Sequence, residues 1–311
     1  MKKLLLLGAS GQDGSLLAEK LIDDFELICP IRQKTETSRL HANLQVFHAD
    51  MTSQKEVVEI FEHYKPDKVC NFAAFSNVFD PWTCSEDVIR ANLLIPSSIL
   101  LAMLQTKSNA KFVQASSSLI FGHGNVEICD EKTVRSPAYP YGISKFAADN
   151  LIQEYRSIHG INACSAILFN HESERRSSQF FTRKVVLAAR QISLGEKIDK
   201  LKLGNLNAKR DMGFARDHVE ATRLMILEDD PEDYVIGTGK FTCMREFVED
   251  AFRFYGLDYK EHTILSDDCS QRMETTAVRA NTMKLNCRLG WEARSFSATK
   301  LIQEELEHGE K

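Results

Sequence analysis

The N-terminal glycine turn constrains the fold of this chain more than any other feature. Four consecutive leucines, Leu4–Leu7, form an apolar run that is followed by Gly8-Ala9-Ser10-Gly11-Gln12-Asp13-Gly14 and then by a helical pattern of leucines. A buried strand, a glycine turn and a helix in this order suit a dinucleotide, because glycines let the backbone approach a pyrophosphate and a helix N-terminus favours its negative charge. The spacing is G-x-x-G-x-x-G instead of G-x-G-x-x-G, so a tight turn without a ligand is the alternative.

Strand-like and helix-like segments alternate through the first half of the chain. This alternation predicts an α/β fold of Rossmann type, a doubly wound parallel sheet covered by helices on both faces. We expect strands near 3–8, 25–31, 44–49, 67–73, 111–117 and 162–169. We expect helices near 12–23, 53–64, 85–106 and 140–159. Pro96 should kink or divide the third of these helices.

The pattern becomes irregular after about residue 170. Polar segments there separate shorter helical patterns near 180–194, 215–228, 243–255 and 295–308. We interpret this half as a smaller lobe over the carboxyl ends of the strands, where open α/β sheets bind ligands. The prediction is a dinucleotide-binding domain over 1–169 and a mainly substrate-binding lobe over 170–311, with crossovers of the chain between them.

Composition excludes several classes of protein. The chain has 311 residues, 43% of them hydrophobic, and a net charge of −5, which disfavours a nucleic-acid surface. We expect no membrane span, because no apolar run approaches 18 residues, and no signal peptide, because the leucine run is short and lacks a cleavage site. The eight cysteines are scattered, which predicts free thiols in a cytoplasmic protein, and no metal site is expected.

Tyr141 and Lys145 form the main candidate for chemistry. They are four residues apart in a helical pattern and so project from one face, where the ammonium can lower the phenol pKa. Ser117, at the end of a predicted strand, can offer a second hydroxyl to the same substrate oxygen. This trio suits proton transfer at an alcohol or carbonyl while a hydride moves elsewhere. A Y-x-x-x-K match alone is weak, since most such pairs lie on ordinary helix surface.

Three longer motifs resemble the GDP-mannose 4,6-dehydratases, which are extended short-chain dehydrogenase/reductases. The glycine turn through Ser15 looks like the family's G-x-T-G-Q-D-G-S. The run 168–176, with 181–184 after it, is similar to L-F-N-H-E-S-x-R-R and F-x-T-R-K. The run 203–211 looks like L-G-N-L-N-A-x-R-D, with Met212 in place of a tryptophan.

The resemblance implies a role for each matching position. Hydride transfer would use Ser117, Tyr141 and Lys145. The cofactor would be bound by Gly8, Gly11, Gln12, Asp13, Gly14, Asp50, Tyr141 and Lys145. The GDP part of a nucleotide sugar would contact Asn170, Lys184, Arg210 and Arg272. Arg175 and Arg176 would lie near the cofactor at a subunit interface, which implies a homodimer or homotetramer.

The type of nicotinamide cofactor stays open. The expected second strand is followed by Arg32-Gln33-Lys34, without an acid to bind a ribose 2′-hydroxyl. Arg32 suits a 2′-phosphate and therefore NADP. Related dehydratases often have two basic residues in a row here, and Gln33 replaces one of them. NAD and NADP are both compatible with this sequence.

The chain departs from the family at position 119. The dehydratases place a glutamate two residues after their hydroxyl residue, where it takes the C5 proton, and the corresponding residue here is Leu119. Leucine cannot accept a proton, so elimination would need another carboxylate, such as Glu131 or Asp80. A second departure is Thr275, which replaces a glutamate that follows the diphosphate-binding arginine.

These departures predict an NAD(P)-dependent oxidoreductase that acts at C4 of a GDP-linked hexose or heptose without eliminating water. Dehydrogenation and ketone reduction are both compatible with it. The alternatives are a GDP-mannose 4,6-dehydratase with a displaced base, a GDP-sugar 4-epimerase, and a non-catalytic cofactor sensor. A sensor would have no need of the intact trio.

Overall fold

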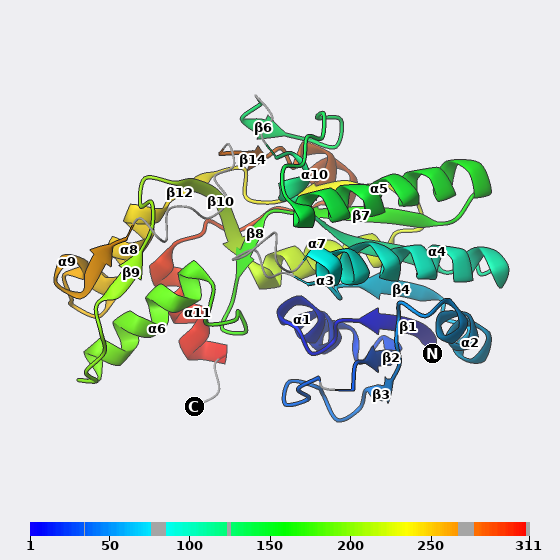
Figure 1. The fold of residues 1–311 in the computed structure, drawn as a ribbon, viewed down its shortest axis with the longest axis horizontal. Coiled ribbons are helices and arrows are strands. Elements are labelled where there is room, and N and C mark those ends of the chain that lie inside the picture. The colour runs from blue at the N-terminus through cyan, green and yellow to red at the C-terminus, as the bar shows by residue number, and fades with distance from the viewer. Residues whose placement is uncertain (34, 76–84, 123–125, 267–276, 309–311) are drawn as a thin grey trace.

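The computed structural model describes residues 1–33, 35–75, 85–122, 126–266 and 277–308 (Figure 1). Its main element is a seven-stranded sheet in the order β11-β7-β5-β4-β1-β2-β3, in which every neighbouring pair is parallel. The strands are β1 (Lys2–Leu7), β2 (Phe25–Ile31), β3 (Gln45–His48), β4 (Lys68–Asn71), β5 (Lys111–Ser117), β7 (Ala163–Leu168) and β11 (Tyr234–Ile236). The Rossmann-type prediction is confirmed.

Helices cover both faces of this sheet. One face packs against α1 (Gln12–Leu21) and α7 (Ala215–Leu227). The other packs against α2 (Gln54–Tyr64), α4 (Ile95–Gln105) and α5 (Pro140–His159). The strands are apolar on both sides because both sides are covered, as the unbroken burial of Leu4–Leu7 illustrates.

The expected third helix is divided into three parts. These are α3 (Ser85–Ile89), a π-helical segment η1 (Arg90–Leu94) and α4. Pro96 stands in the first turn of α4, directly after the π-helical segment, where the hydrogen-bond pattern changes from π to α. The helix therefore changes type next to the proline, although the backbone stays helical from Ser85 to Gln105.

The same stretch bears on the predicted absence of a membrane span. By length and composition alone, Ser85–Gln105 could cross a membrane, with a mean hydropathy of 1.5 and 44% of the window buried. Core helices commonly pass this test. Ile99, Leu100 and Met103 pack in the core beside α2 and α5, so its apolar character is used inside the fold.

The smaller lobe lies at the left of Figure 1 and has its own core. Its helices are α6 (Phe181–Ser193), α8 (Met244–Phe254), α9 (Tyr259–His262) and α11 (Ala298–His308), and α10 (Met283–Leu289) packs against β11 and α7. Its three-stranded sheet contains β8 (Asn170–Glu172), β10 (Lys209–Phe214) and β12 (Phe241–Cys243). Two-stranded pairs join β9 (Leu201–Leu203) to β13 (Thr263–Leu265) and β6 (Ile128–Cys129) to β14 (Arg279–Ala280).

The chain crosses between the two regions after residue 169. Helix α7 and strand β11 return to the large sheet, although they follow the predicted boundary in sequence. The division into 1–169 and 170–311 stays a prediction that allows for such crossovers. Of the described cysteines, Cys29, Cys70, Cys129 and Cys164 are buried free thiols, whereas Cys84 and Cys269 lie outside the described residues.

Candidate active site

The glycine turn joins β1 to α1 with no room for side chains. Gly8 has a φ of +79°, and a Cβ at Gly14 would lie 2.1 Å from the carbonyl oxygen of Gly8. The Gly11 N–H donates to that oxygen at 2.9 Å, and no side chain caps the start of α1. The first N–H groups of the helix therefore stay available to an anion, as the sequence predicted for a pyrophosphate.

A cavity of about 1310 Å³ opens from this turn along the carboxyl ends of the strands and into the smaller lobe. Its lining brings together most of the predicted site residues, namely Gly8, Gly11, Gln12, Asp13, Gly14, Ser117, Tyr141, Lys145, Asn170, Lys184 and Arg210. The described residues that line it do not include Arg32 or Asp50. Arg272 lies outside the described residues. The roles predicted for these three stay predictions.

Ser117 and Tyr141 both line the cavity. Ser117 is the last residue of β5, Tyr141 lies in the first turn of α5, and the Ser117 hydroxyl is close enough to the phenol to act on its pKa. Gly142 makes this approach feasible, because a Cβ there would lie 2.6 Å from the carbonyl oxygen of Leu119. The sequence analysis did not assign this role to Gly142. Its position directly after the tyrosine is the signal that could have indicated it.

Lys145 lies one turn further along α5. Its Nζ donates to the carbonyl oxygen of Ala115 at 2.7 Å and is 5.8 Å from the centre of the Tyr141 ring. Burial lowers the pKa of Lys145 to about 8, although Asp149 and Asp13 act to raise it. The ammonium is therefore held beside the trio, aimed at the backbone of β5 instead of at the phenol.

The phenol of Tyr141 is harder to ionise than an exposed one. Burial raises its pKa, while Arg176 and the nearby Ser117 hydroxyl act in the opposite direction. The sequence suggested that Lys145 would lower this pKa. In the structure the charge that lowers the Tyr141 pKa most is that of Arg176. The Arg176 guanidinium stacks 3.6 Å from the centre of the Phe180 ring in the cavity wall.

No described carboxylate takes the place of the glutamate missing at position 119. Leu119 lines the cavity directly after Ser117. The Glu131 carboxylate is outside the cavity lining and accepts from the backbone N–H of Val235 at 2.8 Å. Asp80 lies outside the described residues.

The acidic side chains that do line the cavity are already engaged. They are Asp13, Glu36, Glu172, Glu174 and Asp211. Asp211, for example, accepts from the backbone N–H groups of Thr238, Gly239 and Ala280. Glu172 accepts from the hydroxyl of Thr182 at 2.6 Å. Each of these five carboxylates, among the described residues, has a hydrogen-bonding or ionic partner in the chain.

Asp13 and His171 form a partly buried ion pair between α1 and β8. The His171 Nε2 lies 3.0 Å from an Asp13 oxygen, and its Nδ1 lies 2.7 Å from the carbonyl oxygen of Phe169. Burial opposes both charges, yet the pair lowers the pKa of Asp13 to about 2 and raises that of His171. The neighbouring His218 ring stacks on His171 and stays neutral, because burial lowers its pKa to about 3.

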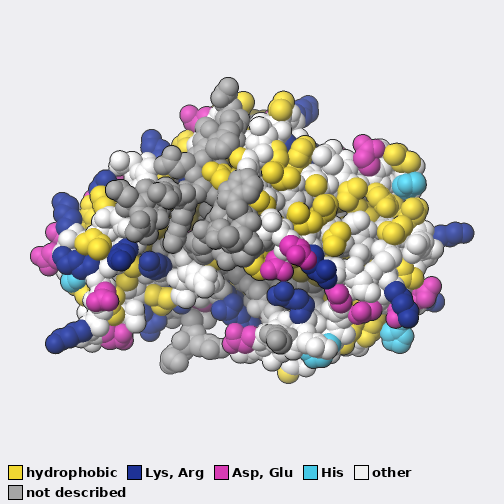
Figure 2. Space-filling model, in the orientation of Figure 1, with side chains coloured by type: hydrophobic (Ala, Val, Ile, Leu, Met, Phe, Trp, Pro, Cys, Tyr) yellow, Lys and Arg dark blue, Asp and Glu magenta, His cyan; other side chains and the backbone are white. Residues whose placement is uncertain are grey.

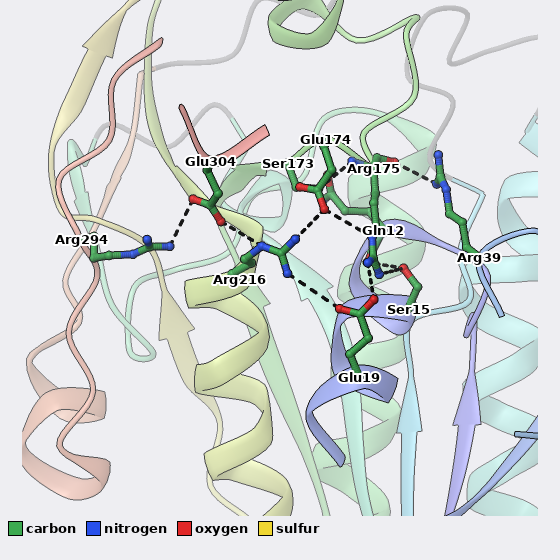
Figure 3. A network of polar contacts seen from close by, with 10 residues as sticks. All are labelled: Gln12, Ser15, Glu19, Arg39, Ser173, Glu174, Arg175, Arg216, Arg294 and Glu304. Carbon is green, nitrogen blue, oxygen red and sulfur yellow. Dashed lines mark hydrogen bonds and ion pairs between the residues drawn. The ribbon is translucent and has the colours of Figure 1, made fainter. Parts of the chain in front are cut away.

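Charged side chains extend this junction toward α11 (Figure 3). Arg175 reaches from the loop after β8 to Ser15 and Glu19 on α1. Arg216 on α7 contacts Glu174 at 2.6 Å and Glu304 on α11 at 3.1 Å. Arg175 and Arg176 thus have partners within this chain, and their implied role between subunits stays a prediction.

Basic side chains surround the far end of the cavity. Lys184, in the first turn of α6, places its Nζ 3.5 Å from the carbonyl oxygen of Lys202. Lys202, Lys209 and Arg210 line the cavity beside it. In Figure 2 dark-blue side chains gather at the left, over this lobe. Such a group suits a diphosphate, because guanidinium and ammonium groups make charge-assisted hydrogen bonds to phosphate oxygens.

The loop after β2 contributes residues that the sequence analysis missed. Glu36, Ser38 and Arg39 line the cavity, whereas Arg32 does not. The Arg39 guanidinium donates to the carbonyl oxygen of Arg175 at 3.0 Å, which fixes it beside α1. Arg39 lies in a loop that has no helical or strand periodicity, so its charge was the only feature of the sequence that could have indicated a role.

Comparison with known proteins agrees with this arrangement. The family described as GDP-mannose 4,6 dehydratase matches residues 5–305. GDP-mannose 4,6 dehydratase 1 of Arabidopsis thaliana is 33% identical over 308 residues, which cover 93% of this chain and 85% of that protein. It is one of several curated relatives with similar names.

Solved structures share the fold at lower sequence identity. The UDP-glucose 4-epimerase of Thermotoga maritima with UDP-glucose has a TM-score of 0.87 at 19% identity, over 99% of this chain and 100% of that one. The dTDP-glucose 4,6-dehydratase of Bacillus anthracis with NAD has 0.84 at 17%, over 99% and 97%. RMD of Pseudomonas aeruginosa with NADPH has 0.80 at 19%, over 98% of each chain. With the sequence match along nearly its whole length, the chain belongs to the GDP-mannose 4,6-dehydratase family of extended short-chain dehydrogenase/reductases.

Proposed function

We propose that the protein transfers a hydride between C4 of a GDP-linked hexose or heptose and a nicotinamide cofactor, without eliminating water. The observation that carries this proposal is that Ser117, Tyr141 and Lys145 come together in the lining of one cavity, which runs from the glycine turn to a basic lobe. Family membership supports the GDP-sugar class and the use of NAD or NADP.

The residues of the chain divide the proton chemistry between them. Tyr141 exchanges the proton of the C4 hydroxyl, and Ser117 holds the same oxygen by a hydrogen bond. When the alcohol is oxidised, its hydroxyl proton goes to the phenolate and its C4 hydride to the bound cofactor. Because burial keeps the phenol protonated, the site as it stands suits the donation of a proton to a C4 ketone. Oxidation needs added positive charge near the phenol, and would also need a partner to reoxidise the cofactor.

The cavity fits a nicotinamide dinucleotide. A Cβ at Gly8 or Gly14 would fill the space against the turn, and the uncapped start of α1 faces the cavity. NAD and NADP are not distinguished by these contacts. Arg39 and Arg32 are the described basic groups of the loop after β2 that could meet a 2′-phosphate.

The dehydratase reading is the one that the comparisons support better, since the curated relatives carry that name. In its favour, all three members of the trio are present. Against it stand Leu119 in the cavity wall and the engaged carboxylates around it. These residues support a reaction that changes only C4. A 4-epimerase is a further variant, in which the 4-keto sugar rotates in the site before the hydride returns to its other face.

The oligomeric state and the location of the protein are proposals as well. We infer a homodimer or homotetramer in the cytoplasm, with no nucleic-acid, membrane or metal partner. Exposed Ile89, Leu94 and Ile143 on neighbouring helices of the large sheet support self-association. The described residues hold no group of three metal-ligating side chains, which is compatible with metal-free chemistry.

The experiment that tests the reaction is incubation with GDP-sugars and either cofactor in heavy water. The products should differ from their substrates by two hydrogens or, for an epimerase, by nothing, and should carry no solvent deuterium at C5 or C6. Rapid loss of water, with a product 18 mass units lighter in ordinary water and solvent deuterium on its carbon skeleton in heavy water, would establish the dehydratase alternative. A sensor would give no absorbance change near 340 nm with any sugar.

Leu119→Glu provides the matched variant for this experiment. It returns a carboxylate to the position after Ser118, so it should add some elimination if the geometry suits. Leu119→Gln is its control, because it has a similar shape and no base. A gain in both variants would show that polarity, and not the carboxylate, opens the route.

A further inference from the structure

Asp149 is a buried carboxylate that the proposed reaction does not use. It lies on α5 one turn after Lys145, its side chain is fully buried, and it is not among the cavity-lining residues. Its two oxygens accept from different strands. Oδ2 accepts from the Ser116 hydroxyl of β5 at 2.6 Å, and Oδ1 accepts from the Ser165 hydroxyl of β7 at 2.7 Å.

Together with Lys145, this carboxylate fixes the end of β5. The Lys145 ammonium donates to the carbonyl oxygen of Ala115, and Asp149 accepts from the side chain of Ser116. Successive turns of α5 therefore form hydrogen bonds to successive residues of β5, directly before Ser117. Because Tyr141 is on the same helix and Ser117 follows Ser116 on β5, these two contacts tie the helix that carries Tyr141 to the end of the strand that carries Ser117.

Three charged side chains influence Asp149, and they are Arg135, Lys145 and Asp233. The Arg135 guanidinium, from the segment before α5, lies 3.8 Å from Oδ2. Lys145 interacts with it along α5, and Asp233, before β11, opposes its ionisation. Burial raises the pKa of Asp149 to about 6, while Arg135 and the two serines act to lower it.

The two buried charges depend on each other. Burial lowers the pKa of Lys145, and the charge that does most to raise it again is the carboxylate of Asp149. A neutral Asp149 would leave a buried ammonium without this counter-charge, which is costly in a low-dielectric interior.

We propose that Asp149 is a positioning residue for the reaction, which holds Ser117 against Tyr141 through Ser116 and keeps Lys145 charged, so that activity is lost when Asp149 takes up a proton. This inference rests on the proposed function of the same site. It adds a buried acid, outside the trio, that sets the lower pH limit of activity.

The first test compares pH profiles of kcat and kcat/KM between pH 5 and 9. The parent should lose activity below about pH 6, following the pKa of Asp149. Asp149→Asn should lower kcat by about tenfold or more at pH 7.5, with KM changed less, and should remove the acidic limb. An unchanged acidic limb in this variant, or activity within twofold of the parent, would overturn the proposal.

Ser165→Ala keeps the inference falsifiable if Asp149→Asn does not fold. It removes the hydrogen bond on the side away from Ser117, so it should shift the acidic limb to higher pH. Ser157→Ala is the control, since that hydroxyl donates to the Glu154 carbonyl oxygen on exposed helix surface. An equal fall in rate at every pH in Ser165→Ala would indicate a merely structural role and contradict the proposal.

A measurement without substrate separates this inference from the proposed function. The folded-state pKa of about 6 lies above the ordinary value of 3.8, so the native protein binds an additional proton between these values. Stability should therefore fall as pH rises from about 4 to 6, and Asp149→Asn should reduce that fall. If no GDP-sugar supports redox chemistry, the proposed function fails. A stability profile unaltered by Asp149→Asn would show that the titration assigned to Asp149 is wrong.

Discussion

The two ends of the cavity are built differently. At the sheet end, Ser117, Tyr141 and Lys145 come from a long strand and a long helix, and Lys145 is only 2% exposed. At the lobe end, the side chain of Lys184 on α6 is exposed and that of Arg210 on β10 is half-buried. Lys184 makes one long contact, to a backbone carbonyl 3.5 Å away.

This difference suggests a division of labour. Packed elements on both sides hold the hydroxyls at the sheet end, which suits groups that must act at one geometry. The lobe end offers long cationic side chains that can adjust to a diphosphate. Changes at the sheet end should therefore act on the rate, and changes at the lobe end on affinity.

The largest effect is expected for Tyr141→Phe. The variant keeps the ring and loses the hydroxyl that exchanges the C4 proton, so kcat should fall by about 10³-fold or more while cofactor affinity stays close to the parent's. Steady-state rates and cofactor fluorescence titrations would measure the two quantities. Tyr155→Phe, on the same helix but outside the cavity lining, is the control. A Phe variant within tenfold of the parent rate would contradict the role given to Tyr141.

The junction between the two ends should respond to pH. The pKa of His171 is raised in the folded protein, so protonated His171 adds to the free energy of unfolding below pH 6.5. That contribution is lost as the pH rises through the pKa of His171 in the folded protein. The lowered pKa of Asp13, about 2, means that its share is present above about pH 4 and is lost toward pH 2. His171→Gln should therefore lower the free energy of unfolding more near pH 5 than near pH 9 in chemical denaturation.

His218→Gln is the matched control for this prediction. It removes the ring that stacks on His171 but no charge, because His218 is neutral at both values of pH. Its cost should be similar at pH 5 and pH 9. The ion pair would be excluded as a source of stability if His171→Gln behaved in the same way.

A smaller effect is expected at the lobe end. Lys184→Met should raise KM for the GDP-sugar about tenfold and leave kcat within a few-fold, since one charge-assisted hydrogen bond to the diphosphate is lost. The same variant should reduce the protection that GDP gives against thermal unfolding. Lys197→Met, on an exposed segment outside the cavity lining, should change neither quantity.

The nucleotide itself gives the contrast that could refute the lobe assignment. In the parent protein, GDP should protect more than UDP, CDP or dTDP. Equal protection by UDP or dTDP would mean that the lobe recognises only a diphosphate. If Lys184→Met changed kcat as much as KM, this would contradict the proposal that the sheet end sets the rate and the lobe end sets the affinity.

The sheet end was also the part that the sequence predicted best. Its strands are unbroken apolar runs, and its helix over 140–159 ends at Gly160 in the left-handed region, so pattern and punctuation agree. Strand β11 was missed because Tyr234–Ile236 is a short apolar segment among acidic residues, and only pairing with β7 makes it a strand.

Side-chain partners could not be read from the sequence in the same way. The motifs placed Asp13 at the cofactor, but its contact with His171 joins residues 158 positions apart. The phenol pKa depends on Arg176 and on burial, which are properties of the assembled site. Asp149 gave no signal at all, because its serine partners come from two different strands.

The charged network in Figure 3 alters how the end of the folded region should be treated in the laboratory. Glu304 belongs to α11, and it neutralises Arg216, which in turn shares Glu19 of α1 with Arg175. A truncation before α11 would leave Arg216 with one carboxylate fewer and shift its pull toward α1. Shortening the protein at that end should therefore disturb α1, the helix that follows the N-terminal glycine turn, and a tag is safer when a spacer separates it from α11.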